Sequence, residues 1–450
     1  MKTQDLPRAA DELQQLEAAA VKAAPAERAE YARLRARLLL LQGRSNEGLR
    51  WAEEAMRMAP AAGFTGANLR MFEIDLTYAL AANDRLVEAV ELVRRLDVEP
   101  REGLIAIENC LCFLLDGAVD LRLLRAGLQS ARQIEFVNLL DRARGPLARI
   151  CAAALAGDIE TEFVRRVIAL KQLAPPPLAG PHWPWPVHVR TLGGFCLHIQ
   201  GERYQPSHKT QDKPLELLKL LVTCQALGRD SAEKGWIAER LWPDAEAGNA
   251  RKSLDMTIGR LRRLLGRDDT VLANEGRLRL SPTTVWTDIK PLRQSLSRAR
   301  TQRDQHAARR PASISEAASS IAAVLEHYGG PYLADKEGPP WLLAGREAIT
   351  AAVRNTLLSA DAMLAGSADA LLIQALEKAF ALDSTSEDLA RALMRAHLRQ
   401  GRNTEAVRVY RRLREMLSLL LGLAPSAESD HIRDQAYAAE ASRSASSPAA

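Results

Sequence analysis

The 450-residue sequence predicts a mainly α-helical protein in which helical repeats flank a smaller central domain with short β-sheets. Three observations predict this fold class. Leu, Ala and Arg recur at helical spacing through residues 1–175, and helical patterns return from about residue 293. Between these regions, apolar and polar residues alternate with a period of two, which is typical of strands. A proline-rich segment separates the first helical region from the central one.

The composition is that of a globular protein, with 47% hydrophobic and 26% charged residues. The net charge is only +5, so a nucleic-acid-binding role requires local clustering of basic residues. The amino terminus lacks the apolar segment of a signal peptide, and no apolar run reaches the roughly eighteen residues of a membrane span. The five cysteines are scattered without a C-x-x-C pair. We therefore expect a cytoplasmic protein with no membrane association.

A repeated cassette characterises the first 175 residues. Each copy consists of a helix, a short polar turn and a second helix, as in "LLLLQGRSNEGLRWAEEAM" and "TYALAANDRLVEAVELVRR". Such pairs stack into α-solenoids of the tetratricopeptide type. The cassette returns near the other end of the chain in "RAHLRQGRNTEAVRVYRRL". The matching positions are Arg44 with Glu47, Arg85 with Glu88, and Arg402 with Glu405.

The segment "LAPPPLAGPHWPWP" (173–186) contains six prolines, which exclude a helix and favour extended polyproline geometry. We interpret residues 176–186 as a domain linker, and a proline-rich ligand motif is the alternative. Trp183 and Trp185 are expected to pack against the following domain rather than to stack on bases.

The central domain, residues 187–292, begins with strands. "VHVRTL" and "FCLHIQ" alternate on either side of Gly193-Gly194, and "ERYQP" follows as a third short strand. Three helices come next: 213–227, then 231–242 with Ser231 as a candidate N-cap, then a long helix from about Asn249 to Leu265. A hairpin around Asn274-Glu275-Gly276 closes the domain. This order predicts a winged helix-turn-helix with an added amino-terminal sheet.

The long helix has an apolar face and a basic face. At 100° per residue, Ala250, Leu254, Ile258, Leu261 and Leu265 cluster as a core face. Outward-facing residues can enter a major groove, and outward arginines on the hairpin suit phosphates or a minor groove. The candidate base-facing residues are Lys252, Asp255, Met256 and Gly259. The candidate phosphate or wing residues are Arg251, Arg260, Arg262, Arg263, Arg277 and Arg279.

After the hairpin, "RARTQRDQHAARRPASIS" (298–315) has the composition of a loop. Helical patterns then continue to about residue 437, so we expect a second helical-repeat domain over 293–437. The tail 438–450, which ends in "ASRSASSPAA", is expected to be disordered.

These segments resemble two adjacent modules of one bacterial family. Leu192-Gly193-x-Phe195, "LWPD", "LRRLLG" and Asp288 resemble the OmpR/PhoB-type winged helix of SARP-like transcriptional regulators. Residues 293–437 are similar to the bacterial transcriptional activator domain that follows it in this family. The residues that carry this second similarity are Gly330-Pro331-Tyr332-Leu333, Trp341 with Arg346, "GRNTEAVRVY", and Gly422-Leu423-Ala424-Pro425-Ser426. The helical region before the winged helix is similar to MalT-like repeats.

The resemblance implies a transcriptional activator that binds double-stranded promoter DNA, usually at direct repeats, and contacts RNA polymerase. A homodimer on such repeats is one arrangement that this implies. It assigns the polymerase contact to the loop that contains Asp244 and Glu246. No P-loop motif or phospho-receiver segment is visible, so the resemblance does not identify the regulatory signal. The concave faces of the repeats are candidate sites for a peptide or small-molecule effector.

Enzymatic chemistry has little support in the sequence. Cys196, His198 and His188 fall on neighbouring strands but lack the spacing of a metal site or a nucleophilic pair. We therefore expect no enzyme activity, no catalytic or metal-binding residues and no cofactor. The alternative function is a helical-repeat interaction scaffold whose winged helix contacts protein. It would be favoured if the arginines of the basic helix and wing were paired with acids of the repeats.

Overall fold

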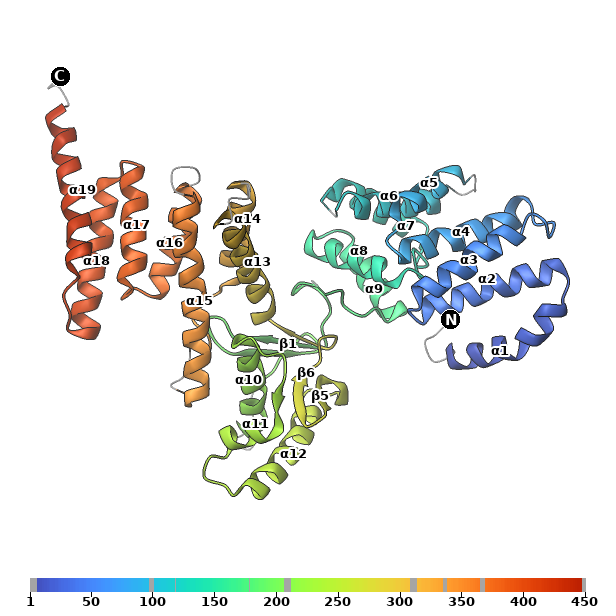
Figure 1. Ribbon diagram of the computed structural model, residues 1–450, viewed down its shortest axis with the longest axis horizontal. Helices are drawn as coiled ribbons and strands as arrows, with labels where there is room; N and C mark the ends of the chain where they lie inside the picture. Colours follow the sequence, from blue (N-terminus) through green and yellow to red (C-terminus); the bar gives the residue numbers. More distant parts are fainter. Residues whose placement is uncertain are drawn as a thin grey trace. The chain divides into compact units, whose positions relative to one another are not determined.

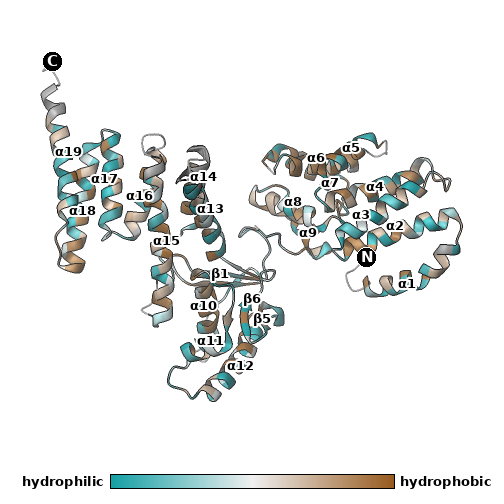
Figure 2. Ribbon diagram, in the orientation of Figure 1, coloured by the Kyte–Doolittle hydropathy of each residue, from teal (hydrophilic) through white to brown (hydrophobic). Residues whose placement is uncertain are grey.

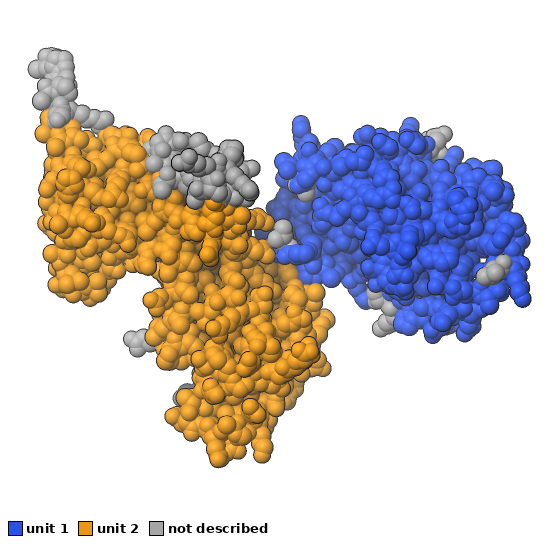
Figure 3. Space-filling view, in the orientation of Figure 1, with its two compact units in different colours: residues 1–184 blue, residues 185–450 orange. Residues whose placement is uncertain are grey.

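The computed structural model describes residues 6–96, 101–117, 119–177, 179–205, 212–307, 314–334, 338–364 and 369–446. The chain divides into two compact units, residues 1–184 and residues 185–450, coloured separately in Figure 3. No helix among the described residues combines the length and apolar character needed to cross a membrane. Figure 2 shows polar and apolar residues interleaved along the helices of both units.

The first unit is all helical and forms a tetratricopeptide-like array (Figure 1). Most of its helices pack against their neighbours in sequence, as in a solenoid. The helices are α1 (Leu6–Lys22), α2 (Pro25–Leu41), α3 (Ser45–Met58), α4 (Gly66–Ala82), α5 (Leu86–Arg95), α6 (Glu102–Leu115), α7 (Leu121–Gln133), α8 (Arg144–Ala156) and α9 (Thr161–Lys171).

The repeated cassette has the same backbone geometry at each of its three sites. Its arginine is the N-cap of the second helix, with φ/ψ of −85/60°, −80/57° and −90/63° at Arg44, Arg85 and Arg402. The preceding residue has a positive φ of 78°, 56° and 66° at Gly43, Asp84 and Gly401. Arg44 and Arg85 form ion pairs with Glu47 and Glu88, whereas Glu405 pairs with Arg408. The turn therefore repeats more strictly than the ion pair.

A buried carboxylate links three parts of the first unit. Asp75 of α4 is 2% exposed and accepts hydrogen bonds from Arg33 and Arg37 of α2, at 3.0 and 2.7 Å, and from Arg142 just before α8. Burial lowers the pKa of Arg37, and the attraction of Asp75 opposes that effect. A buried charge requires such pairing, so this cluster fixes the packing of α2, α4 and α8.

The second unit contains the strands and the remaining helices. The strands are β1 (Val187–Arg190), β2 (Cys196–Ile199), β3 (Glu202–Arg203), β4 (Ala232–Glu233), β5 (Val271–Asn274), β6 (Arg277–Leu280) and β7 (Val285–Thr287). The helices are α10 (Asp212–Ala226), α11 (Lys234–Leu241), α12 (Ala247–Leu264), α13 (Ile289–Ala307), α14 (Ile314–His327), α15 (Pro340–Leu364), α16 (Asp369–Leu382), α17 (Glu387–Arg399), α18 (Asn403–Leu421) and α19 (Ala427–Ser446).

Two small sheets frame the helix-turn-helix. One has the order β3-β2-β1-β7, in which β1 pairs antiparallel with β2 and parallel with β7. The other has the order β4-β6-β5, and its β5–β6 hairpin is the wing. Together with α10, α11 and α12 they form the expected winged helix-turn-helix with an amino-terminal sheet. Trp183 and Trp185 are 5% and 9% exposed, and their packing against the winged helix stays a prediction.

Three local expectations were wrong. Residues 232–233 form strand β4 instead of starting a helix, because their backbone pairs with Leu278 and Arg277, and Glu233 replaces Ser231 as the N-cap. Helix α13 covers 298–307 of the expected loop, where Ala299 is buried and Arg, Gln and Ala favour a helix. Helix α19 continues to residue 446 and so covers 438–446 of the expected disordered tail, because Ala436 anchors the preceding turn against α18 and the alanines that follow favour a helix.

The winged helix and the helices that follow it share one hydrophobic core. Residues from β1 through α12 and from α13 through α18, between Val187 and Leu417, belong to a single buried cluster. Helix α10 lies at the centre, because it packs against α11, α12, α13 and α15. The close approach of α10 and α15 depends on Gly345, where a Cβ atom would lie 2.6 Å from Cγ2 of Thr223.

A loop between α14 and α15 docks onto the amino-terminal sheet and completes this union. Gly193 N–H donates to Pro331 O at 3.0 Å, and Leu333 N–H donates to Thr191 O at 2.7 Å. We call the contact of Gly330–Leu333 with Thr191–Gly193 the docking lock. At its tightest point Gly330 has φ +145°, and a Cβ atom there would lie 2.9 Å from Cα of Gly193. Two glycines are therefore needed where the two backbones meet.

Side chains reinforce the docking lock from both sides. Asp288, after β7, accepts from Thr191 N and Leu192 N at 2.6 and 2.7 Å, and from Thr191 Oγ1 at 2.7 Å. Arg346 of α15 donates to Tyr332 O and Leu333 O at 2.9 and 2.5 Å. The fully buried Tyr332 donates its hydroxyl to Thr223 Oγ1 of α10 at 2.7 Å, since that oxygen already donates to Lys219 O.

Tyr332→Phe removes this buried hydrogen bond without a change of shape. We expect the free energy of unfolding of the second unit to fall by about 1 kcal/mol. Urea unfolding followed by tryptophan fluorescence measures this change. Tyr437→Phe is the matched control, because Tyr437 is 48% exposed and its hydroxyl should contribute less than about 0.5 kcal/mol. Equal effects of the two substitutions would contradict the role given to Tyr332.

Candidate nucleic-acid interface

Helix α12 presents its apolar face to the core, as the sequence predicts. Ala250, Leu254, Ile258, Leu261 and Leu265 are each at most 4% exposed. The helix follows α11 after a short turn over residues 242–246, in which Ala245 N–H donates to Trp242 O at 3.2 Å. A short helix, a tight turn and a longer amphipathic helix form the helix-turn-helix arrangement.

The opposite face of α12 is open. Lys252 is exposed, Met256 is 58% exposed, and a Cβ atom at Gly259 would meet nothing within 4 Å. Asp255 also faces outward, but its carboxylate is paired with Lys234 Nζ at 2.8 Å. Three of the four base-facing candidates are therefore unobstructed, and the fourth is tied to the start of α11.

The wing turn lies beside the start of α11. Glu275 and Gly276 have φ of 48° and 73°, so both positions of the two-residue turn are left-handed, as in a type I′ hairpin. Lys234 N–H donates to Gly276 O at 2.8 Å, which ties this turn to α11. A hollow of about 430 Å³ lies between the turn and α12, and Arg251 and Asp255 contribute to its lining. The wing and the exposed face of α12 thus border one surface.

The arginines expected to hold phosphates differ in their surroundings. Arg262 is half-buried and donates from Nε and Nη2 to Val271 O of β5, at 3.1 and 2.6 Å. Arg277 donates to Ser231 Oγ and Ser231 O at 2.9 and 3.0 Å and lies 3.4 Å from Glu233. These two arginines hold the wing to the helices.

The other basic candidates remain available to a ligand. Arg263 is exposed, and its one hydrogen bond within the described part of the chain is a 3.3 Å bond to Gly259 O of its own helix. Four of these candidates have no hydrogen bond or ion pair to any described residue, namely Arg251, Lys252, Arg260 and Arg279. They surround the exposed face of α12 and the outward side of β6, where unneutralised positive charge attracts a polyanion.

The pairing of these arginines bears on the alternative function. The partners of Arg262, Arg263 and Arg277 belong to the winged helix itself, and no acid of the helical repeats pairs with them within the described part of the chain. The observation that would have favoured a protein-only scaffold is therefore not found.

The turn before α12 carries the residues expected to meet polymerase. Asp244 and Glu246 are exposed. Lys213 of α10 donates to Leu241 O at 3.0 Å and lies 5.7 Å from the Trp242 ring, which fixes the start of the turn. The acidic side chains thus project from an anchored segment.

The three sulfur and imidazole candidates lie on the amino-terminal sheet, away from α12. Cys196 Sγ is 3.8 Å from His198 Nδ1, and His198 pairs with His188 across β1 and β2. His188 stacks on Trp286 of β7 with ring centroids 4.1 Å apart. Among the described residues, no three His, Cys, Asp or Glu side chains are placed to hold a metal ion. These groups form a packing cluster.

Residues 292–435 match the bacterial transcriptional activator domain family. This match confirms the resemblance stated for the carboxy-terminal region. The matched residues run from α13 into the first half of α19, and these helices directly follow the winged helix. No curated protein matches the chain.

Two solved structures show limited similarity to this chain. Mycobacterium tuberculosis EmbR, in complex with a low-affinity phosphopeptide, is 21% identical over 58% of this chain and 69% of its own, with a TM-score of 0.40. Yeast Tom70 is 14% identical over 99% of this chain and 88% of its own, with a TM-score of 0.20.

The burial of His188 predicts a pH dependence of stability. Burial lowers the pKa of His188 to about 4, and Arg190 and His198 add to the effect. The unfolded chain binds a proton near the ordinary pKa of about 6.5, so this contribution to stability is present above that pH and is lost as the pH falls. Between about pH 7 and pH 5 the expected loss is about 1 kcal/mol after allowance for partial solvation.

The measurement compares urea unfolding of the wild type and of His188→Phe at the two pH values. We expect the variant to keep the stacking on Trp286 and to lose less stability on acidification. An unchanged pH dependence in the variant would show that other groups cause it.

Proposed function

We propose that the protein is a SARP-like, sequence-specific DNA-binding transcriptional regulator that activates transcription from promoter DNA. The observation that carries this proposal is a cluster of four cations around the exposed face of α12 and the wing, none of which pairs with a residue that the structure describes. The adjoining bacterial transcriptional activator domain supports the assignment to transcription. No catalytic role is assigned to any residue.

In the proposed complex, α12 enters the major groove and the wing lies along the backbone or minor groove. Lys252 and Met256 approach base edges, where an ammonium can donate to guanine and an apolar side chain can contact the thymine methyl group. Asp255 keeps Lys234 beside them. Arg251, Arg260, Arg263 and Arg279 neutralise phosphates, which supplies affinity without sequence preference.

Activation requires a contact with the transcription machinery. We assign it to the turn before α12, where the exposed carboxylates of Asp244 and Glu246 can pair with basic side chains of RNA polymerase. We further propose that the protein is cytoplasmic and binds direct repeats as a homodimer. Half-site spacing in DNA selected from a random pool gives the number of protomers.

Arg263→Ala tests the phosphate contacts. We expect weaker binding to the selected operator and to an unrelated duplex alike, with the salt dependence of log K reduced by about one unit. Fluorescence anisotropy over a salt titration measures both quantities. Failure of the pure wild-type protein to bind any duplex at low salt would contradict the proposed function.

Arg262→Ala is the matched comparison, because Arg262 lies next to Arg263 but is bonded to Val271 O. We expect it to lower the free energy of unfolding by about 1 kcal/mol through loss of the link between α12 and the wing. Its salt slope should stay near the wild-type value. A reduced slope without loss of stability would place Arg262 among the phosphate contacts.

Gly259→Ala should affect the stability of the protein and its affinity for DNA in opposite directions. The added Cβ meets no atom within 4 Å, and alanine favours a helix by about 1 kcal/mol, so thermal stability should rise. If the backbone at Gly259 approaches the bases closely, affinity for the operator should fall while binding to unrelated DNA is unchanged. Increased stability with unaltered operator affinity would show that Gly259 does not contact DNA.

A further inference from the structure

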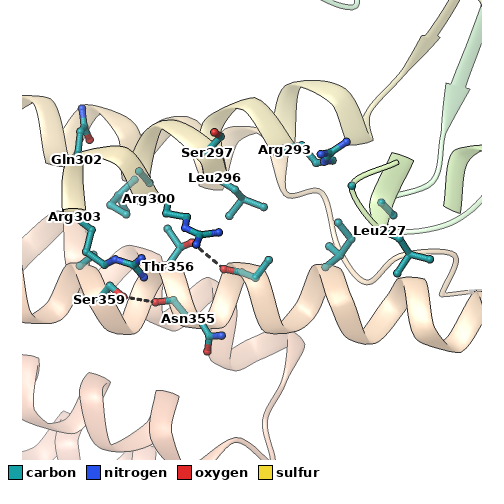
Figure 4. Close-up of a pocket in the computed structure, with 17 residues that line it drawn as sticks. Leu227, Arg293, Leu296, Ser297, Arg300, Gln302, Arg303, Asn355, Thr356 and Ser359 are labelled. Carbon is teal, nitrogen blue, oxygen red and sulfur yellow. Dashed lines mark hydrogen bonds between the residues drawn. The ribbon is translucent and has the colours of Figure 1, made fainter. Parts of the chain in front are cut away.

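A pocket of about 630 Å³ lies between α13 and α15, away from α12 and the wing (Figure 4). The turn after α10, at Leu227 and Gly228, contributes to its lining. This volume is within the range of small-molecule binding sites, about 300–1,000 Å³. No part of the proposed DNA interface lines it, so any ligand bound there leaves α12 free.

Three arginines of α13 line this pocket, and none of the described residues that line it is acidic. Arg293 has a loose ion pair, 3.8 Å long, with the exposed Asp230, and Arg303 pairs with the neighbouring Asp304 at 2.8 Å. Arg300 has no hydrogen bond or ion pair with any residue that the structure describes. Exposed ion pairs are weak and exchange readily with other partners, so Arg293 and Arg303 can also interact with a bound anion beside Arg300.

The arrangement on α13 concentrates this charge. Figure 4 shows Arg300 and Arg303 extending from α13 toward Thr356 and Ser359 on α15. Like charges three residues apart on one helix repel each other, and an anion between them would relieve that repulsion. Planar guanidinium groups bind carboxylate and phosphate oxygens with paired hydrogen bonds.

The rest of the lining suits an organic body rather than a bare ion. Leu296, Ile321 and Ile349 supply apolar surface. Thr356 and Ser359 donate their hydroxyl hydrogens to Ala352 O and Asn355 O of their own helix, which leaves their oxygens able to accept a hydrogen bond. A mixed apolar and polar lining with a few charged groups is typical of metabolite sites.

We propose that this pocket binds a small organic anion, whose carboxylate or phosphate group is held by Arg300 and Arg303. The body of the ligand lies along α15 toward Arg293. Because the site touches α10, α13 and α15, its occupant bridges the winged helix and the activator domain. The inference concerns ligand binding and does not require that α12 bind DNA.

Isothermal titration calorimetry of the full chain tests the proposal with two sets of probes. AMP and glucose 6-phosphate represent organic phosphates, and citrate and benzoate represent carboxylates. Adenosine and glucose are uncharged controls, and inorganic phosphate tests for an adventitious ion only. We expect at least one organic anion to bind with a dissociation constant on the order of 0.1 mM for about twenty non-hydrogen atoms.

Arg300→Gln and Arg303→Gln should each weaken that binding about tenfold, because each removes a charge-assisted hydrogen bond. Arg298→Gln is the matched control, since Arg298 is exposed on the same helix and does not line the pocket. It should change affinity by less than about twofold. Circular dichroism confirms that the variants fold.

Several results would overturn the proposal. The first is that none of the four organic anions binds at concentrations up to about 10 mM, far above the expected dissociation constant. The second is that inorganic phosphate or the uncharged controls bind as tightly as the organic anions. The third is that Arg298→Gln loses as much affinity as Arg300→Gln and Arg303→Gln. DNA binding is measured separately, so its failure would leave this result intact.

Discussion

The docking lock is the contact on which the second unit depends. Backbone hydrogen bonds join Thr191–Gly193 to Pro331 and Leu333, and Asp288 and Arg346 satisfy the neighbouring donors and acceptors. It brings together segments about 140 residues apart in sequence, an arrangement with a high entropic cost. A single hydrophobic core that runs from β1 into α18 offsets that cost. The winged helix is consequently part of the activator domain's body rather than a module on a flexible tether.

This union determines how the candidate interface is presented. Helix α10 lies between the docking lock and α12, and Lys213 at its start fixes the turn before α12. Arg262 and Arg277 then hold the wing against the helices. Because Arg262 and Arg277 are bonded within the winged helix, the positive charge that can bind a polyanion comes from residues such as Lys252, Arg260 and Arg279. Helices α10 and α12 and the wing are already held in place before binding. Less conformational entropy is therefore lost when their exposed cations bind a regular polyanion.

Periodicity predicted the core face of α12 from Ala250 to Leu265, because a helix that packs on one side must bury every third or fourth residue. Periodicity also puts Arg263 opposite that face and Arg262 at its flank. It could not predict that Arg262 is bonded to another element while Arg263 bonds within its own helix. Their difference arises from Val271 O, a carbonyl of β5, and tertiary contacts of this kind leave no local pattern. The same holds for strand β4, which exists only because β6 lies beside it, and for the helix over 298–307.

The lock and the pocket between α13 and α15 involve the same helices. Helix α13 begins immediately after Asp288, and α15 carries Arg346 of the lock and Thr356 of the pocket. An anion that binds between α13 and α15 only in the folded protein stabilises the packing of these helices that the docking lock maintains, because binding shifts the equilibrium toward the folded form. Such a ligand changes DNA affinity only if it binds the DNA-competent arrangement more tightly than another arrangement. The elements that could differ are α13 and the turn after α10, since both border the pocket and adjoin the helices that support α12.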